Sequence, residues 1–417
     1  MDKELFINNR KKLLELMEND SILVSFSRRK DTDDIFCQRY NLNRNYFYLC
    51  GVVEFENIVV LCKIDNKTSE MIFINPYDEY KAKWVGAPKS KEEVTNISGI
   101  SNVRYLDTFD SFISGVINNV NNIYLDICDN ELDANQLTSD QIYAKKLLTK
   151  YPFIKILNSR KLFTIARTVK SDIEIAEMKK AIEITNQGLI NVLKHIKPAM
   201  EYELESYFDQ KVKALGATGY SFPTIAASGA NGCCLHYSEN NSFAKDGDLI
   251  LFDLGASLNM YCADISRTYP INGKFTPRQK QIYNIVLGGQ KLVFNNAKPG
   301  VTTRELNSIL RKYFAVELKK IGLINEGTDA EVSKYYFHGV SHHIGLDCHD
   351  LCDYGPLKAG CVISNEPGLY IPEYNIGIRI EDDVLITENG AEWLSPQIIK
   401  EVDEIENFIA NNKAIEE

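Results

Sequence analysis

The feature that most constrains the fold is a set of two predicted β-hairpins that carry acidic residues among apolar ones. In the first, residues 249–253 (LILFD) form a strand and residues 261–269 (YCADISRTY) form the returning strand. A turn centred on Leu258–Asn259 would place Asp253 directly opposite Asp264. Directly opposed residues hold their Cβ atoms about 5 Å apart on one face of a sheet. We therefore predict that these two carboxylates face each other.

The second predicted hairpin repeats this arrangement. Residues 362–371 (VISNEPGLYI) form the incoming strand, and residues 376–383 (IGIRIEDD) form the outgoing one. A turn centred on Glu373–Tyr374 would place Glu366 opposite Glu381, although a β-bulge in either hairpin would shift its register. The flanking residues are apolar or β-branched, so we expect this second pair of carboxylates to be buried.

Four carboxylates gathered in this way require neutralisation. Like charges opposed on a sheet destabilise it, and a buried carboxylate needs an ion pair or a metal. Two divalent cations carry four positive charges, which balance the four negative charges of the carboxylates. We therefore predict a site for two metal ions. Oxygen-rich ligation with one imidazole suits Mn²⁺, with Zn²⁺, Co²⁺ or Fe²⁺ as alternatives.

The imidazole ligand is expected from residues 337–350 (FHGVSHHIGLDCHD), which hold four of the six histidines of the chain. Each of them alone would be read as a structural histidine, but core packing does not explain this density. His236 lies in a Gly-rich loop that could reach the same site. His195 closes a helical stripe of apolar residues before Pro198, so we expect a structural role for it.

The ten cysteines have no spacing typical of a disulfide framework, and we expect reduced thiols. Two local groupings, Cys233–Cys234 and Cys348 with Cys352, lack the paired C-x-x-C spacing of a structural zinc site. We expect these residues to be packing thiols.

Length and composition indicate two domains of ordinary globular character. The chain has 417 residues, of which 44% are hydrophobic, which is enough for two cores. A net charge of −10 argues against a nucleic-acid-binding surface. No apolar run is long enough for a membrane span, and the first residues lack the apolar core of a signal peptide. We therefore expect no membrane association and a cytoplasmic location.

The predicted fold class is α/β (α+β), with a mixed α/β domain over residues 1–165 and a second domain over residues 166–417. The first domain contains no histidine, and its strand-like runs are 21–26, 57–62, 71–75 and 122–127. In the second domain, three helices are predicted from capping signals that begin at Ser171, Thr276 and Thr302.

Trp84, beside Gly86 and Pro88, is predicted to lie on a loop. It would serve either as a partly buried anchor or as part of a lid over an active site, its own or that of a partner subunit.

The motifs resemble those of the pita-bread metallopeptidases, the superfamily of methionine aminopeptidase, Xaa-Pro aminopeptidase, prolidase and creatinase. The segments FDLGA, YCADISRT, HGVSHHIGLDCHD, NEPGLY and GIRIEDD follow the order of that family's ligand-bearing motifs. The resemblance implies a C-terminal pita-bread catalytic domain. The segment RYNLNRNYFYLCGVVE resembles, more weakly, the N-terminal domain of the creatinase and aminopeptidase P type.

The resemblance also implies a role for each motif residue. The implied metal ligands are Asp253, Asp264, His342, Glu366 and Glu381. The implied substrate-binding residues are His236, His338, His349, Tyr370 and Arg379. The implied catalytic groups, with Glu366 as general base, are Glu366, His236 and His349. The implied reaction is attack on a peptide bond by a hydroxide that bridges the two metals.

Within the superfamily, the chain most resembles the Xaa-Pro aminopeptidases, because of the serine in HGVSHHIG and the short connection from Glu366 to Glu381. The implied substrates are peptides with proline in the second position, and a homodimer or homotetramer is expected. Prolidase, which takes an Xaa-Pro dipeptide, is the alternative. A non-catalytic pita-bread protein that binds peptides or proteins is a third hypothesis, disfavoured by the complete ligand set. His343 departs from the aromatic residue usual in aminopeptidases P.

Overall fold

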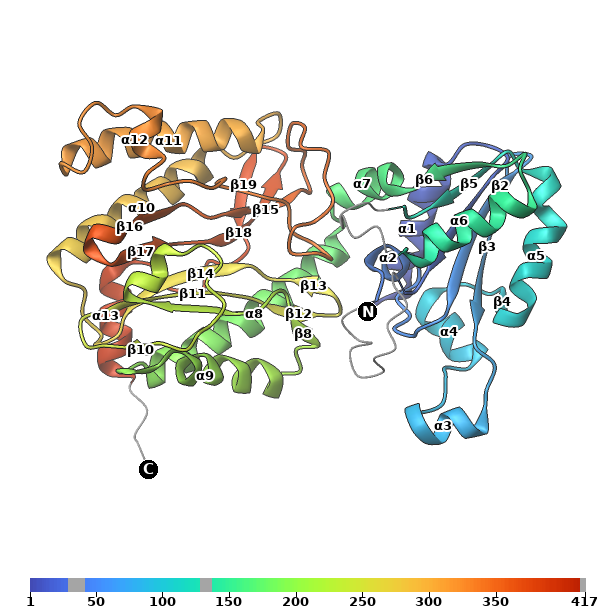
Figure 1. Cartoon of the computed structure of the whole chain (residues 1–417), viewed down its shortest axis with the longest axis horizontal. Helices are drawn as coiled ribbons and strands as arrows, with labels where there is room; N and C mark the ends of the chain where they lie inside the picture. Colours follow the sequence, from blue (N-terminus) through green and yellow to red (C-terminus); the bar gives the residue numbers. More distant parts are fainter. Residues whose placement is uncertain (29–41, 128–136, 413–417) are drawn as a thin grey trace. The chain divides into compact units, whose positions relative to one another are not determined.

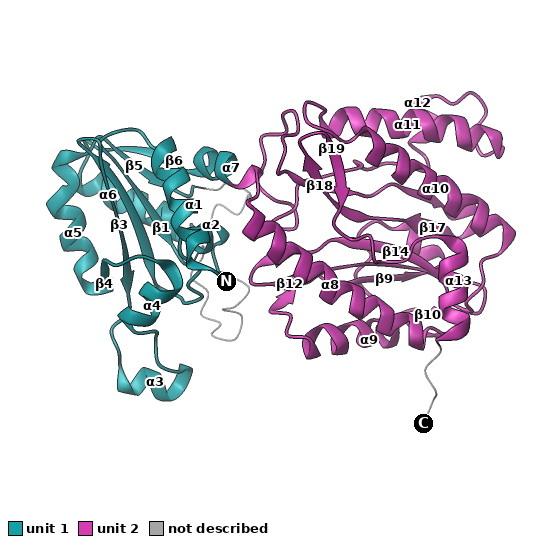
Figure 2. Ribbon diagram, turned by 180° about the vertical axis from the view of Figure 1, so that it is seen from behind, with its two compact units in different colours: residues 1–166 teal, residues 167–417 magenta. Residues whose placement is uncertain are grey.

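The computed structural model describes residues 1–28, 42–127 and 137–412. The chain divides into two compact units, residues 1–166 and residues 167–417, which Figure 2 distinguishes by colour. The domain boundary predicted from the sequence fell one residue earlier. Among the described helices, none is long and apolar enough to cross a membrane.

Unit 1 is built around a mixed six-stranded sheet with the order β4-β3-β2-β1-β5-β6. The central strands β1, β2 and β3 pair antiparallel, whereas β4, β5 and β6 each join a neighbour in parallel. Four of these strands coincide with the predicted ones to within a few residues. The strands are β1 (Ser21–Phe26), β2 (Ile58–Ile64), β3 (Lys67–Ile74), β4 (Val103–Tyr105), β5 (Asn122–Leu125) and β6 (Lys155–Asn158).

Helices pack around this sheet, as Figure 1 shows. Buried apolar side chains of β1, β2, β3 and β5 meet those of α5 and α6 in one core cluster. The α-helices are α1 (Lys3–Leu16), α2 (Arg44–Cys50), α3 (Glu79–Val85), α4 (Lys91–Ser98), α5 (Phe109–Val116), α6 (Ser139–Lys150) and α7 (Arg160–Thr168).

Trp84 does not lie on a loop, which corrects the sequence-based prediction. It occupies the last turn of α3, a helix that begins where the Asp78 side chain accepts a hydrogen bond from the Lys81 backbone N–H. The helix ends at Gly86, whose φ of 87° few other residues adopt. With 74% of its surface exposed, Trp84 is not a buried anchor within this chain either.

Unit 2 contains several short antiparallel sheets instead of one continuous sheet, with the orders β14-β11-β9, β13-β12-β8, β15-β18-β19, β16-β17 and β10-β7. In Figures 1 and 2 these strands lie between the helix pair α8–α9 and the helix pair α10–α11. The strands are β7 (Ala199–Met200), β8 (Gly219–Tyr220), β9 (Ile225–Ser228), β10 (Phe243–Ala244), β11 (Leu249–Leu254), β12 (Ala256–Leu258), β13 (Tyr261–Cys262), β14 (Ile265–Pro270), β15 (Val362–Asn365), β16 (Gly368–Ile371), β17 (Ile376–Arg379), β18 (Asp382–Thr387) and β19 (Gly390–Trp393).

Three helices of unit 2 begin where the sequence predicts. Ser171, Thr276 and Thr302 each form a complete capping box with the residue three positions on. His195 ends the first of these helices and stacks on Tyr207 at a centroid distance of 4.1 Å, in agreement with a structural role. The α-helices are α8 (Asp172–His195), α9 (Glu201–Ala214), α10 (Pro277–Asn296), α11 (Thr303–Lys320), α12 (Asp329–Val332) and α13 (Val402–Asn411).

The predicted register of the first hairpin is wrong by two residues. Asp253 pairs with Ser266 and not with Asp264, because the turn is centred on Asn259 and Met260. Both residues have positive φ, 49° and 69°, as a two-residue hairpin turn requires. A shift of two residues keeps the same face, so Asp264 is a diagonal neighbour of Asp253 instead of its direct partner.

The predicted register of the second hairpin is confirmed. The ladder of β15 with β18 ends at Asn365 opposite Asp382, and the ladder of β16 with β17 begins at Gly368 opposite Arg379. Both ladders share one register, which sets Glu366 against Glu381 in the interruption between them. Because their backbones leave the ladder there, the Glu366 N–H bonds the Val340 carbonyl 3.0 Å away, outside this hairpin.

Candidate metal centre

The two aspartates of the first hairpin reach the site from different environments. Asp253, on β11, accepts a 2.6 Å hydrogen bond from Arg379 through its Oδ2. Its Oδ1 is buried and has no hydrogen-bond partner in the part of the chain that the structure describes. Asp264 precedes β14, and its Oδ2 lies 3.3 Å from Nε2 of His342. One oxygen of Asp264 thus faces His342, and one oxygen of Asp253 has no partner among the described residues.

His342 connects the two hairpins. Its Nδ1 lies 3.1 Å from the carbonyl oxygen of His343, which fixes the ring and leaves Nε2 directed at the carboxylates. The same Nε2 is 3.5 Å from Oε1 of Glu366. Ser364, two residues before that glutamate on β15, donates to Glu366 and accepts from the backbone N–H of His342. The histidine and the glutamate are therefore held by one hydroxyl group.

Glu381 is positioned by Ser266. The Ser266 hydroxyl donates to Oε2 of Glu381 at 2.7 Å and accepts from Nε of Arg379 at 2.8 Å. The Glu381 backbone N–H also bonds the Ser266 carbonyl at 3.0 Å. The Ser266 hydroxyl therefore orients both the Glu381 carboxylate and the Arg379 guanidinium. The guanidinium in turn holds Asp253.

The crowding of these carboxylates perturbs their ionisation. Burial raises the pKa of Glu381 well above its usual range, and the neighbouring charges of Asp264 and Glu366 raise it further. The pKa of Glu366 is raised to about 7, chiefly by burial. Burial and the charge of Asp264 also raise the pKa of Asp253, against the opposing effect of Arg379. Among the described side chains, the positive charges near these carboxylates do not balance their negative charges.

The same negative charges also raise the pKa of His342, but here they favour the charged form of the side chain. Burial alone would lower its pKa, but the hydrogen bond with Asp264 and the charge of Glu366 raise the pKa to about 9. A proton on this imidazole thus adds one positive charge beside the carboxylates.

A chain of hydrogen bonds runs from Asp253 to His338. Arg379 donates to the Tyr370 hydroxyl at 3.0 Å, and this hydroxyl lies 2.9 Å from Nε2 of His338. Nδ1 of His338 lies 2.7 Å from the Gly339 carbonyl, which makes Nδ1 the protonated nitrogen and Nε2 the acceptor. Burial and the nearby Arg379 lower the pKa of His338 to about 3, so the imidazole is neutral.

The two remaining predicted histidines are exposed. The ring of His349 stacks on that of His342 at 3.9 Å, and burial of its inner edge together with the charge of His342 lowers the pKa of His349. His236 follows the short helical turn at 229–233 and acts electrostatically on both His338 and His349. All ten predicted site residues thus gather around one place.

The residues fit divalent metal ions on three observations. Asp264, His342 and Glu381 offer ligand atoms within 4.8 Å of one another. Among the described residues, the buried Oδ1 of Asp253 has no hydrogen-bond partner. The raised pKa values of the glutamates mark an uncompensated negative charge, which a divalent cation would neutralise.

Sequence reasoning missed the residues that orient these ligands. Ser266 and Ser364 carry no motif signal, because a hydroxyl acquires its role only from the register of the strands. Asp383 was also missed: it is buried and accepts a hydrogen bond from the Asp264 backbone N–H. Burial and the charge of Asp264 raise its pKa well above the usual range. Cys348 differs from the expected packing thiol, because its Sγ lies 2.9 Å from Oδ2 of Asp264.

The loop that carries Cys348 and His349 is anchored by charge. Asp350, which is buried, forms ion pairs with Arg167 and with Lys170, the latter at 2.9 Å. Asp347 binds the same arginine at 2.6 Å. His343, the departure noted in the sequence, is buried in this region, and burial lowers its pKa to about 4.

A fold of two units with this acid-rich donor set defines a metal-dependent hydrolase. The chain belongs to metallopeptidase family M24, whose sequence profile matches residues 176–388. The profile described as "Aminopeptidase P, N-terminal domain" matches residues 6–124. Membership in this family implies that the chain binds divalent metal ions.

Similar proteins cover almost the whole chain. The Xaa-Pro aminopeptidase of Haemophilus influenzae is 30% identical over 98% of this chain and 98% of that protein. A Bacillus anthracis structure, assigned provisionally to aminopeptidase P, is 43% identical with a TM-score of 0.94 over 99% of both chains. The structure of proline aminopeptidase P II from Yersinia pestis is 30% identical with a TM-score of 0.88, over 98% of this chain and 100% of that one.

These comparisons confirm three predictions made from the sequence: the resemblance to aminopeptidase P, the pita-bread fold class with its N-terminal domain, and a hydrolytic enzyme. They do not favour the prolidase alternative.

Proposed function

We propose that the protein removes the N-terminal residue from peptides that carry proline in the second position. The observation that carries the proposal is the convergence of four carboxylates and His342 beside a row of substrate-facing histidines. The relatives named Xaa-Pro aminopeptidase support this substrate class.

We assign the metal ligands to Asp253, Asp264, His342, Glu366 and Glu381. Their four carboxylates match the charge of two divalent cations, and oxygen-rich ligation with one imidazole suits Mn²⁺. When bound, such a pair of cations supplies an activated water and polarises the scissile carbonyl.

Glu366 is the proposed general base. Its carboxylate lies 3.5 Å from Nε2 of His342, among the other proposed ligands, where it could take a proton and return it. Ser364 holds its Oε1 at 3.2 Å and so fixes the direction of transfer. We infer that Glu366 accepts the proton of the attacking water and delivers it to the leaving proline nitrogen.

The histidines would bind and orient the peptide. His338 is neutral and anchored by Tyr370, and Arg379 anchors Tyr370 in turn. His349 and His236 are exposed and can donate hydrogen bonds to the developing oxyanion and to the peptide backbone. The five proposed substrate-binding residues thus form two groups. His338, Tyr370 and Arg379 are held by hydrogen bonds to one another, and His236 and His349 are exposed.

The substrate preference has a physical reason. The bond before proline is a tertiary amide without an N–H, and proline restricts the preceding residue. A site that binds its substrate through metal ions and histidines does not depend on a hydrogen bond from that N–H.

The remaining features are proposals of the same kind. A homodimer or homotetramer and a cytoplasmic location would be consistent with the sequence, and neither a nucleic acid nor a membrane partner is proposed. Size-exclusion chromatography with light scattering tests the assembly.

A peptide series tests the proposed reaction. The Mn²⁺-reconstituted protein is offered Xaa-Pro, Xaa-Pro-Yaa, a longer Xaa-Pro peptide and an Xaa-Ala-Yaa control, and released amino acids are separated. We expect release of the first residue from the longer proline peptides and not from the alanine control. Cleavage of the dipeptide alone would assign the site to a prolidase instead.

A further inference from the structure

The loop between β9 and β10, which carries His236, is tied at both ends to one buried carboxylate. This carboxylate belongs to Glu201, which begins α9 and is 0% exposed. At the start of the loop, its Oε1 accepts from the backbone N–H and from the hydroxyl of Ser228, each at 2.7 Å. At the end of the loop, its Oε2 accepts from the backbone N–H of Ser242 at 2.9 Å. Glu201 therefore closes the loop at its base.

The same carboxylate also holds the middle of the loop. Its Oε1 accepts from Nδ2 of Asn231 at 3.0 Å, and its Oε2 accepts from the hydroxyl of Tyr237 at 2.8 Å. A buried carboxylate needs such donors to offset its lost hydration. All five of these donors come from the one loop, and Tyr237 is the residue next to His236. The last bond therefore fixes the backbone directly beside the histidine.

The loop also rests on β17, the strand that carries Arg379. A Cβ atom on Gly377 of this strand would lie 1.9 Å from the carbonyl oxygen of Gly232, so the two backbones meet with no room for a side chain. The thiol of Cys233 donates to the carbonyl of Ile376 on the same strand at 3.4 Å. The loop is thus fixed between the buried carboxylate and a strand of the proposed substrate site.

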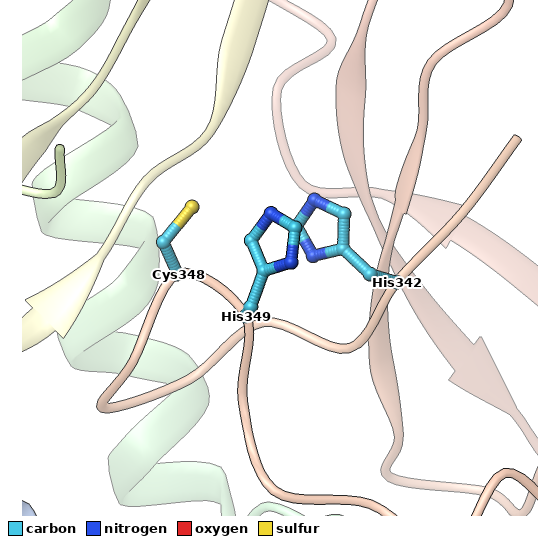
Figure 3. A group of neighbouring side chains, drawn as sticks. All are labelled: His342, Cys348 and His349. Carbon is cyan, nitrogen blue, oxygen red and sulfur yellow. The ribbon is translucent and has the colours of Figure 1, made fainter. Parts of the chain in front are cut away.

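His236 extends from this anchored loop toward the other histidines. Its charge acts on both His338 and His349, and Figure 3 shows the ring of His349 beside that of His342. The side chain of His236 is exposed. Packing therefore does not hold the imidazole, and its place depends on the backbone of the loop.

We propose that Glu201 is a positioning residue for the reaction, which acts through Tyr237 and the loop to hold His236 against the peptide. This inference rests on the proposed function, in which His236 binds the peptide and takes part in catalysis. A group that must meet the substrate is sensitive to its position, because a shift of about 1 Å can lower a rate by about 100-fold.

The first test removes the bond between Glu201 and the neighbour of His236. Tyr237→Phe deletes the hydroxyl and keeps the ring, and kcat/KM for an Xaa-Pro-Yaa peptide is measured for this change alone and combined with His236→Ala. The matched control is Tyr283→Phe, in the same unit, where the lost hydroxyl donates to the Lys400 carbonyl at 3.0 Å. Urea unfolding of each variant separates a loss of stability from a loss of rate.

We expect Tyr237→Phe to lower kcat/KM by roughly 10-fold, the equivalent of one hydrogen bond to a charged group. In the His236→Ala background the same change should have little further effect, because it acts through the missing imidazole. Tyr283→Phe should keep its kcat/KM. An undiminished effect in the His236→Ala background, or no effect in the wild type, would overturn the proposal.

The second test reads the anchoring of the loop without a substrate. Hydrogen exchange of the backbone amides of residues 228–242 is followed by mass spectrometry in the Mn²⁺-reconstituted protein. Glu201→Gln and Tyr237→Phe should speed this exchange, because each removes acceptors or donors of the five bonds, and Tyr283→Phe should not. Unchanged exchange in Glu201→Gln would overturn the proposal. If the wild type cleaves no peptide, the proposed function fails, while the exchange still decides whether Glu201 holds the loop.

Discussion

Removal of the metal should make the stability of unit 2 depend on pH in a defined direction. His342 has a pKa of about 9 in the folded protein, raised from 6.5 by Asp264 and Glu366 against the effect of burial. The folded state therefore holds this proton more tightly than the unfolded state does. The resulting stabilisation is complete below pH 6.5 and is lost as the pH rises toward about 9.

The magnitude follows from the pKa difference. A pH of about 7.5 lies about 1.5 units below the folded-state pKa of His342. Each unit corresponds to about 1.4 kcal/mol of unfolding free energy. The metal-free protein should thus lose about 1.5–2 kcal/mol of unfolding free energy between about pH 7.5 and pH 9. A bound cation takes the place of the proton on His342, so the metal-loaded protein should not show this loss.

Urea unfolding followed by tryptophan fluorescence measures the effect. Trp393 stacks on Phe294 within unit 2, and the exposed Trp84 of unit 1 is the other tryptophan of the chain. A Trp84→Phe background therefore isolates the signal of unit 2.

The loss should become smaller when His342→Gln is added to this background, because the titrating imidazole is gone, whereas Glu381 and Asp383, whose pKa values are also raised, remain. His195→Gln, at a histidine outside the site, should leave it unchanged. Equal pH dependence in the parent and in His342→Gln would refute the reasoning.

Three substitutions test the ligand set and its supports. Asp264→Ala should lower hydrolysis of Xaa-Pro-Yaa by more than the roughly 10–100-fold typical of a lost outer partner, because it removes one of the proposed metal ligands. Near-normal turnover would contradict the assignment. Ser266→Ala should lower metal affinity by about 10–100-fold in equilibrium dialysis, since Glu381 and Arg379 both lose their shared hydroxyl. Asp350→Ala should lower the free energy of unfolding in urea by about 3–5 kcal/mol, because Lys170 loses its buried ion pair. A change below about 1 kcal/mol would show that the loop needs no such anchor.

The sequence predicted the elements of the site better than their local geometry. Helix starts follow from capping boxes, which are local, and the three predicted ones are present. The second hairpin register was predictable because its turn spans residues with strong turn preference, Pro372 to Asn375. The first failed because Met260 adopts a left-handed conformation that a methionine alone does not signal.

Other features lay beyond sequence reasoning for physical reasons. The roles of Ser266 and Ser364 depend on which strands face each other, and a short polar residue in a strand gives no sign of this. Cys348 looked like a packing thiol because its neighbour Asp264 is 84 residues away in the chain. Trp84 looked like a loop residue beside glycine and proline, yet one aspartate cap is enough to form the short helix α3.

A titration of the metal-free protein with Mn²⁺ tests the central claim most directly, with bound metal and hydrolysis of Xaa-Pro-Yaa measured on the same samples. Two equivalents per chain should bind, and activity should rise with the metal bound. Glu381→Gln, which leaves the other four proposed ligands in place, should lower both the number of ions bound and the activity. Full activity without bound metal, or unchanged binding in Glu381→Gln, would contradict a catalytic centre built from these five side chains.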